Sequence, residues 1–301
     1  MAVYVNTNVS SLNGRRYLNN VQNQLSTTYQ RLSSGMRINS AKDDAAGLQI
    51  ADRLTTQING LNQGNRNTND GIALAQTIEG ALDETSGMLQ KIRTLAVQAA
   101  NGTNTKEDRD AIKAEGAALM AEITRIADDT KFGGKTVLVG ATAGSIYNTA
   151  AQNASNKAGQ MTLQVGANNG DAISFDVGNF RFLGILSAVD KDNKTAYTAA
   201  SGLQLQTASG AKAVIELMDK MIAHVDGQRS GLGAIQNRLE SSIRNQSNVA
   251  ANQSDARSRI RDADFAEESA NLSQQSIIQQ AATSMLMQAN SRPQLALSML
   301  G

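Results

Sequence analysis

The two ends of the sequence are polar tracts in which a mostly nonpolar position recurs every three or four residues. In the N-terminal tract these positions are Leu18, Val21, Leu25, Thr28, Leu32 and Met36. In the C-terminal tract they form two interleaved series with a seven-residue period: Leu232, Ile235, Leu239, Ser242, Gln246, Val249, Gln253, Ala256, Ile260 and Ala263. Such spacing places residues on one helix face and is typical of helices that pack against other helices. We therefore expect the two ends to meet, and the chain to work in assemblies.

The middle of the sequence differs from the ends, because it is rich in Gly and Ala and contains short alternating runs. Such runs at 136–139, 161–165 and 173–177 predict strands, and 166–170 predicts the loop of a hairpin. Helical patterns surround this region, at 11–32, 42–102, 105–129, 210–261 and 264–289. The chain is therefore expected to be mainly α.

Two stretches, 141–160 and 187–210, lack any periodicity and are expected to be exposed loops. Residues with special backbone or capping roles mark the expected helix ends. Gly35 suits a left-handed cap after the first helix. Ser40 precedes Asp43 and Asp44, which predicts a capping hydroxyl followed by acids in the first turn of the second helix.

The second expected helix has a seven-residue repeat of its own: Leu61, Thr68, Ala75, Leu82, Leu89 and Ala96. It also contains Gly47, Gly60, Gly64, Gly71, Gly80 and Gly87, and a glycine inside a helix costs about 1 kcal/mol relative to Ala. We interpret these glycines as places of close helix approach, with local bends as the alternative.

Composition narrows the function classes. Hydrophobic residues make up 41% of the chain, but aromatics only 3%, and there is one Pro and no Trp, which suits thin helical bundles. The net charge of +1 argues against non-specific electrostatic binding to nucleic acid or acidic membranes. The absence of Cys excludes disulfides and thiolate metal sites. Without a recognisable signal peptide or membrane span, the sequence by itself predicts a soluble cytoplasmic protein.

Candidate catalytic groups do not form a convincing constellation. Asp43 and Asp44 are adjacent on a helix, where side chains do not face one another, so a helix-start role is favoured. His224 is the single His and has no nucleophile motif beside it, which favours a helix-surface position. The Gly-rich run 166–170 lacks the residues of a phosphate loop. We therefore expect neither an enzyme nor a cofactor.

Several tracts resemble bacterial flagellins. They are residues 30–51 (QRLSSGMRINSAKDDAAGLQIA), 92–103 (IRTLAVQAANGT), 164–168 (QVGAN), 259–268 (RIRDADFAEE) and 288–300. The resemblance covers roughly 1–140 and 160–301. It implies paired terminal helices that form a coiled coil, a long helical bundle and a small β-hairpin region at about 135–180.

The resemblance further implies a filament subunit used for swimming motility. Residues 1–42 and 261–301 would form a discontinuous inner-tube domain, and 43–260 a core domain. The polymerisation residues would lie on the terminal helices: Leu18, Val21, Leu25, Leu32, Ile277, Ile278, Met285 and Leu286. The filament would be extracellular, and its subunit would be secreted without a cleaved signal.

Partners follow from the same resemblance. Besides further copies of the chain, they are the flagellar cap and hook-junction proteins, and an export chaperone that covers the C-terminal helix. A host Toll-like receptor would read the patch that matches Lys91, Leu95 and Glu115. The family usually has Arg at the first of these positions. Lys91 lacks the planar guanidinium group of Arg, so recognition by the receptor is expected to be weaker.

Other functions remain open at the level of sequence. A hook–filament junction protein or another axial component also has paired terminal helices. A signalling coiled coil and an enzyme are the remaining alternatives. Because a helix with a thin nonpolar stripe is marginal alone, we expect the ends to be frayed in the free monomer and ordered in an assembly.

Overall fold

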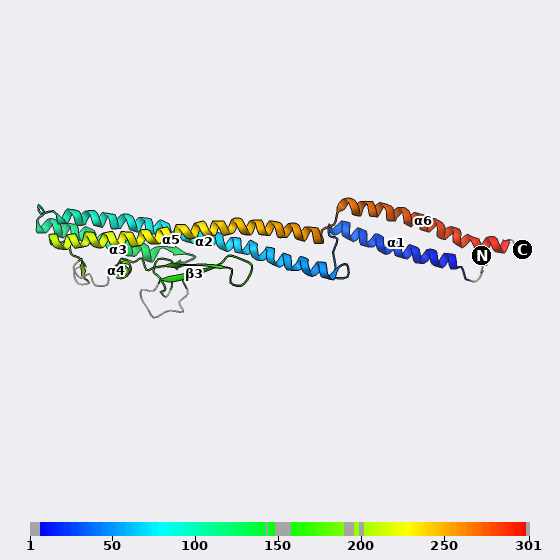
Figure 1. Cartoon of the computed structure of the whole chain (residues 1–301), viewed down its shortest axis with the longest axis horizontal. Helices are drawn as coiled ribbons and strands as arrows, with labels where there is room; N and C mark the ends of the chain where they lie inside the picture. The colour runs from blue at the N-terminus through cyan, green and yellow to red at the C-terminus, as the bar shows by residue number, and fades with distance from the viewer. Residues whose placement is uncertain (1–6, 143, 148–157, 190–195, 199–201, 299–301) are drawn as a thin grey trace. The chain divides into compact units, whose positions relative to one another are not determined.

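The computed structural model describes residues 7–142, 144–147, 158–189, 196–198 and 202–298, the last seven by their backbone alone. The helices are α1 (Val9–Ser34), α2 (Ala45–Ala100), α3 (Lys106–Asp129), α4 (Phe182–Val189), α5 (Ala208–Arg261) and α6 (Phe265–Ser298). The strands are β1 (Lys131–Phe132), β2 (Lys135–Thr136), β3 (Gly159–Gln164), β4 (Ala172–Val177), β5 (Tyr197–Thr198) and β6 (Gly202–Leu203). The expectation of a mainly α fold with a small β region is confirmed (Figure 1).

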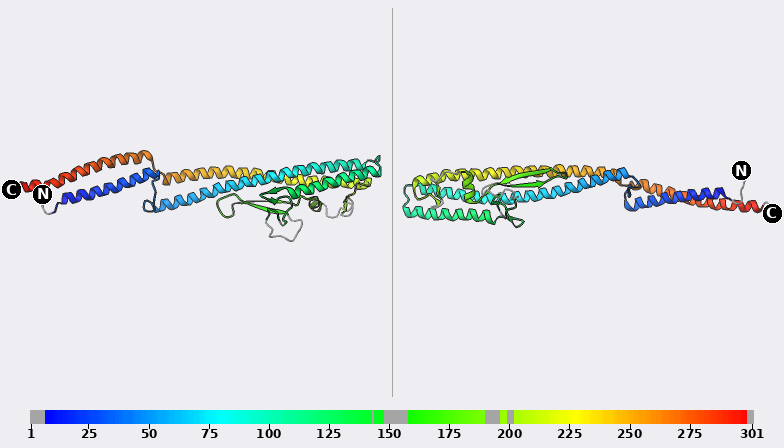
Figure 2. Two further views of the ribbon diagram at one scale, coloured as in Figure 1. Left: turned by 180° about the vertical axis from the view of Figure 1, so that it is seen from behind. Right: turned by 90° about the horizontal axis from the view of Figure 1, so that it is seen from below.

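The chain divides into two compact units, which are described separately. The first comprises residues 1–58 and 250–301, and the second residues 59–249. In the first unit, α1 and α6 lie side by side, as both figures of the whole chain show (Figures 1 and 2). The two ends of the described chain therefore meet, as expected, but the partner of α1 is α6, whereas the predicted C-terminal stripe lies almost entirely on α5.

The N-terminal stripe is the contact face of α1. Val21 and Thr28 are buried, and Leu18, Leu25 and Leu32 are half-buried. The helix ends as expected at Gly35, whose φ of 69° is left-handed and whose N–H donates to the carbonyl of Arg31. Only a residue without a Cβ adopts this conformation freely.

The core of the second unit lies between α2, α3 and α5, with α4 and the β3–β4 hairpin packed against them. All six positions of the α2 repeat are buried: Leu61, Thr68, Ala75, Leu82, Leu89 and Ala96. The α5 stripe follows the prediction only in part, since Leu232, Leu239 and Gln246 are buried but Val249 and Ala256 are exposed. Ala250 is buried in place of its neighbour Val249.

The β3–β4 hairpin confirms the prediction made from alternation. Its antiparallel register pairs Gly159 with Val177 and Gln164 with Ala172. The loop 166–170 connects the strands, and Gly170 supplies the positive φ of 94° that the turn requires. The run 136–139 is different, because β2 ends at Thr136 and the next three residues are buried without forming a regular strand.

The start of α2 corrects the predicted cap. The helix begins at Ala45, and the carboxylate of Asp44 accepts the N–H of Gly47 at 2.9 Å. The hydroxyl and the N–H of Ser40 both donate to Asp43 instead. Ser40 therefore closes the preceding turn, and Asp44 caps the helix. The third helix begins as predicted, with Thr105 and Asp108 forming a reciprocal capping box.

The glycines of α2 also receive a different explanation. A Cβ on Gly60 would lie 2.7 Å from Ala167, and a Cβ on Gly64 or Gly71 would overlap Val165 or Leu163. The closest neighbour of these three glycines is thus the β3–β4 hairpin, and Gly64 also approaches α5, since its Cβ would lie 3.2 Å from Oε1 of Gln246. Gly80 and Gly87 have open space around them.

The expected exposed loops are partly structured. In the range 187–210, α4 extends to Val189, and Leu203 and Leu205 are buried. In the range 141–160, Tyr147 is buried and β3 begins at Gly159. Residues 143, 148–157, 190–195 and 199–201 lie outside the described residues. Isolated buried residues produce no period, so the sequence pattern could not reveal them.

The end of the chain is also more helical than expected. The helical pattern of the sequence ends at Ala289, but α6 continues to Ser298. The single Pro, Pro293, therefore lies within the helix and does not end it.

Tyr147 predicts a pH dependence of stability. Its hydroxyl donates to the carbonyl of Val137 at 2.6 Å, and burial raises its pKa well above the usual value near 10. The stabilisation is therefore fully present below about pH 10 and is lost as the pH rises towards the folded-state pKa, because the unfolded chain releases the proton first. We expect Tyr147→Phe to cost about 1 kcal/mol at pH 7.

Urea midpoints at pH 7 and pH 11 provide the measurement. The native chain is expected to lose more stability between these values than Tyr147→Phe does. Tyr29→Phe is the control, because Tyr29 is 55% exposed. An equal loss in the native chain and in Tyr147→Phe would contradict the assignment of the alkaline effect to Tyr147.

Candidate functional site: the terminal helix pair

The two terminal helices, α1 and α6, form a two-helix surface called here the terminal helix pair. The contact positions on α6 alternate by four and three residues, and all are buried or half-buried: Glu268, Leu272, Gln275, Gln279, Ala282, Leu286 and Ala289. Gly14 lets the helices approach closely, since a Cβ there would lie 3.0 Å from Cδ1 of Leu286. The seam between α1 and α6 is therefore narrow and mixed in polarity.

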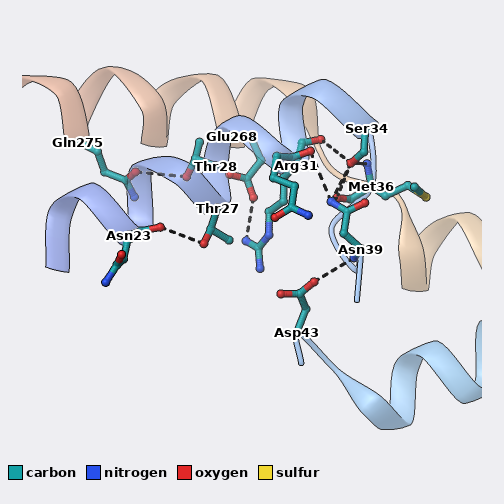
Figure 3. Close-up of polar contacts among 11 residues, drawn as sticks. Asn23, Thr27, Thr28, Arg31, Ser34, Met36, Asn39, Asp43, Glu268 and Gln275 are labelled. Atoms are coloured by element: carbon teal, nitrogen blue, oxygen red, sulfur yellow. Dashed lines mark hydrogen bonds and ion pairs between the residues drawn. The ribbon is translucent and has the colours of Figure 1, made fainter. Parts of the chain in front are cut away.

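Polar contacts across this seam fix how the helices align. Nη1 of Arg31 lies 3.0 Å from Oε1 of Glu268, whose side chain is only 9% exposed (Figure 3). One turn before Arg31, the hydroxyl of Thr28 donates to Oε1 of Gln275 at 3.3 Å. Near the other end of α1, the amide of Asn8 donates to the carbonyl of Ala289 at 2.7 Å. Buried polar partners of this kind specify register at some cost in stability.

The connector after α1 is tied down by its own hydrogen bonds. The amide of Asn39 donates to the hydroxyl of Ser34 at 2.8 Å and to the carbonyl of Met36 at 3.2 Å (Figure 3). The backbone N–H and the hydroxyl of Ser40, together with the N–H of Asn39, hold the pKa of Asp43 below its usual value. These bonds account for the acids of this tract without any catalytic role.

The connector between α5 and α6 is joined to the first. The N–H of Arg37 donates to the carbonyl of Arg261 at 2.7 Å, and the N–H of Ala263 donates to the carbonyl of Gly35 at 3.0 Å. The guanidinium of Arg37 also donates to the carbonyl of Ile260 at 2.8 Å. Two turns more than 200 residues apart in sequence are thus hydrogen-bonded to each other.

The predicted polymerisation residues fall into two groups. Leu18, Val21, Leu25, Leu32, Ile278 and Leu286 are at least half-buried and belong to the contact positions or lie beside them. Ile277 and Met285 point outward, with exposed fractions of 66% and 70%. Sequence periodicity did not separate these groups, because both sets alternate at helical spacing. The second group presents the larger exposed surface to another molecule.

Exposed nonpolar side chains are numerous on the terminal helix pair. On α1 they are Val9, Leu12, Tyr17 and Tyr29, and on α6 they are Phe265, Ile277, Met285 and Met287. Solitary exposed nonpolar residues are ordinary, but this many on two helices indicate a surface that is covered in an assembly. Among the described residues, no helix is long and nonpolar enough to cross a membrane.

The three residues of the predicted receptor patch are brought together in the second unit. Lys91 and Leu95 are one helical turn apart on α2, and Glu115 reaches the same depression from α3. The depression has a volume of about 530 Å³. Lys91 and Glu115 are exposed, and Leu95 is half-buried.

The catalytic alternatives gain no support from the geometry. His224 is half-buried on α5 and stacks on Phe180 with ring centroids 6.0 Å apart, so the expected helix-surface position holds only in part. Over the described ranges, no three His, Cys, Asp or Glu side chains are grouped so that they could hold a metal ion.

Comparison with known proteins covers most of the chain. The family model described as the bacterial flagellin N-terminal helical region matches residues 5–143. The model described as the bacterial flagellin C-terminal helical region matches residues 215–300. Residues 144–214, which include most of the unperiodic middle, lie between the two matches.

Similar proteins are known from several Vibrio species. Flagellin E of Vibrio cholerae is 36% identical over 376 residues, and flagellin D of Vibrio anguillarum is 37% identical over 377, each across the whole of both chains. These alignments are longer than the 301 residues of this chain, so the relatives contain segments that it lacks. A structure described as a flagellar hook-associated protein from Vibrio parahaemolyticus shares the fold, with a TM-score of 0.55 and 17% identity over 73% of this chain and all of that one.

Proposed function

The chain belongs to the bacterial flagellin family, and we propose that its terminal helix pair is the surface through which copies assemble into the filament. It is a structural subunit of the bacterial flagellar filament, which drives swimming motility. The observation that supports the proposed surface is the concentration of exposed nonpolar side chains on α1 and α6. Because flagellins are structural proteins, family membership favours a structural role over catalysis.

Each part of the chain then has a role. Residues 1–42 and 261–301 form the inner tube of the filament, and residues 43–260 form the surrounding core. Support for this division comes from the α1–α6 contact and from the separate core that α2, α3 and α5 build. Each subunit passes force to the next through packed helices, since a chain without Cys cannot form disulfides between subunits.

Seeded polymerisation tests the proposed function. Purified chain is added at neutral pH to short flagellar fragments, and their growth is followed by electron microscopy. We expect the fragments to lengthen. A folded protein that fails to extend them, with its helical content intact by circular dichroism, would contradict the proposal.

The alternative of a hook–filament junction protein is not favoured. The relatives that are 36% and 37% identical over their full length are flagellins. The likeness to the hook-associated structure is at 17% identity and concerns the fold. Copy number distinguishes the two roles, because a filament subunit is present along the whole filament and a junction protein only at its base.

Secretion and partner binding complete the proposal. The chain is exported to the cell exterior, meets the cap and hook-junction proteins there, and is held beforehand by a chaperone on its C-terminal helix. The exposed side chains of Ile277 and Met285 support a covering partner for α6 before assembly. Pull-down from cytoplasm with the full chain and with a chain ending at Asp262 tests this, since only the full chain should retain the chaperone.

A Toll-like receptor is proposed to bind the depression formed by Lys91, Leu95 and Glu115. The supporting observation is that these residues of α2 and α3 lie around one depression. Arg makes paired, planar hydrogen bonds that Lys cannot make. We therefore expect Lys91→Arg to raise the response of receptor-expressing reporter cells to monomer by several-fold. A response unchanged by Lys91→Arg and by Glu115→Ala would place recognition elsewhere.

A further inference from the structure

The terminal helix pair has a groove near one end. It is about 510 Å³ in volume and is lined from α1 by Gly14 and Tyr17 and from α6 by Ala282, Met285 and Ala289. Gly14 and the two alanines leave room because their side chains are small. Tyr17 and Met285 stand at the rim, with exposed fractions of 57% and 70%. Ser10, Asn13 and Gln288 also line the groove, which is thus mainly nonpolar with polar groups beside it, and it has room for an aromatic side chain.

An exposed aromatic side chain lies at the other end of the same helix. Phe265 is the first residue of α6 and is 62% exposed. Of the five Phe in the chain, Phe175, Phe180 and Phe182 are buried and Phe132 is half-buried, so Phe265 alone is exposed. Phe has no polar group that water could satisfy, and the described residues of the first unit leave most of the Phe265 side chain uncovered.

The position of Phe265 is fixed by a helix cap. The carboxylate of Asp264 accepts the N–H of Ala266 at 2.9 Å, and the carbonyl of Asp264 accepts the N–H of Glu268 at 3.0 Å. The buried side chain of Glu268 in turn pairs with Arg31. The backbone that carries Phe265 is therefore well held, and a pre-organised backbone lowers the entropy cost of binding.

Phe265 cannot reach the groove of its own chain. Phe265 and Met285 are twenty residues apart on one helix, which is about 30 Å at 1.5 Å per residue. Resting on the proposed filament role, we propose that Phe265 of one copy inserts into the groove of Gly14, Tyr17, Ala282, Met285 and Ala289 on a second copy. The two surfaces are different patches of the same chain, so the contact is head-to-tail. A head-to-tail contact can repeat from copy to copy and yields an open polymer when its rotation does not close a ring, whereas a self-complementary patch stops at a dimer.

Cysteine cross-linking tests this contact, because the native chain has no Cys. The double variant Phe265→Cys with Met285→Cys is assembled and mildly oxidised. A disulfide requires Cα atoms within about 7 Å, so these two positions of one straight helix cannot be joined within a chain. We expect a ladder of covalent dimers, trimers and longer species from filaments, and none from monomers.

The matched control is Phe265→Cys with Ile277→Cys. Ile277 is also on α6 and is 66% exposed, but it does not line the groove. We expect at most a faint ladder from this pair. Equal ladders from both pairs, a product that stops at dimers, or no product in filaments would each overturn the proposal.

A second form of the experiment removes any dependence on the assembly of the double variants. The single variants Phe265→Cys and Met285→Cys are mixed with an excess of native chain, so that native copies build the filament. Cross-linked dimers that need both single variants support the contact, and their absence overturns it. If the native chain itself does not polymerise, the proposed function fails as well, which separates the two outcomes.

Discussion

Val21→Asp is expected to abolish filament growth while the second unit remains folded. Val21 is 4% exposed and lies at the centre of the seam between α1 and α6. The new carboxylate would be buried in the seam without a cation to pair with. Burying an unpaired charge costs about 3 kcal/mol or more. The helix pair is therefore expected to separate. Seeded polymerisation should fall below detection, and hydrogen exchange should show loss of protection in α1 and α6 but not in the core of α2.

Gln24→Asp is the matched control for this substitution. It introduces the same charge on the same helix, but Gln24 is exposed. Filament growth is expected to be close to that of the native chain. If Val21→Asp polymerises normally, or if both variants fail alike, the seam is not what organises the assembling surface.

Gly64→Ala is expected to destabilise the second unit by about 2–3 kcal/mol, although Ala is the better helix former. The added Cβ would overlap the carbonyl oxygen of Val165 at the end of β3. Backbone cannot move aside as a flexible side chain can, so the hairpin must shift away from α2. Urea unfolding followed by circular dichroism measures the change in free energy, and filament growth reports whether the shifted hairpin still permits assembly.

Gly80→Ala makes the same substitution on the same helix in open space. No atom lies within 4 Å of the added Cβ, so only helix propensity changes. This variant should gain up to about 1 kcal/mol. The opposite signs of the two effects are the diagnostic result, and equal signs would show that the hairpin does not rest on Gly64.

Much of the helical architecture could be predicted from periodicity. The repeat from Leu61 to Ala96 became a buried seam, and the stripe from Leu18 to Leu32 became the contact face of α1. Such predictions succeed because a long helix repeats its environment every seven residues, so many positions report one geometry. The cap predicted at Gly35 is confirmed because it depends on local chemistry alone.

The failures share a physical cause. Gly64 faces a strand that is about 100 residues away in sequence, and no local pattern contains that information. Leu203, Leu205 and Tyr147 are isolated buried residues, so hydrophobic periodicity in the sequence does not predict their burial. Ile277 and Ile278 are neighbours of equal hydrophobicity, yet the first is exposed and the second half-buried. Which of them faces α1 depends on the register between helices that the polar contacts of Glu268 and Gln275 fix.

The hydrogen bond from Asn8 to Ala289 joins residues 281 positions apart, and the pair of Arg31 and Glu268 spans 237. A chain that emerges N-terminus first therefore presents α1 without its partner until nearly all of it has appeared. Contacts of such long separation form slowly and late, because the loop between them must close first. The order of folding then determines when the helix pair is complete. An unfinished chain lacks the completed helix pair, and if that pair is the assembling surface, as proposed, each subunit becomes competent for assembly only once its last helix is in place.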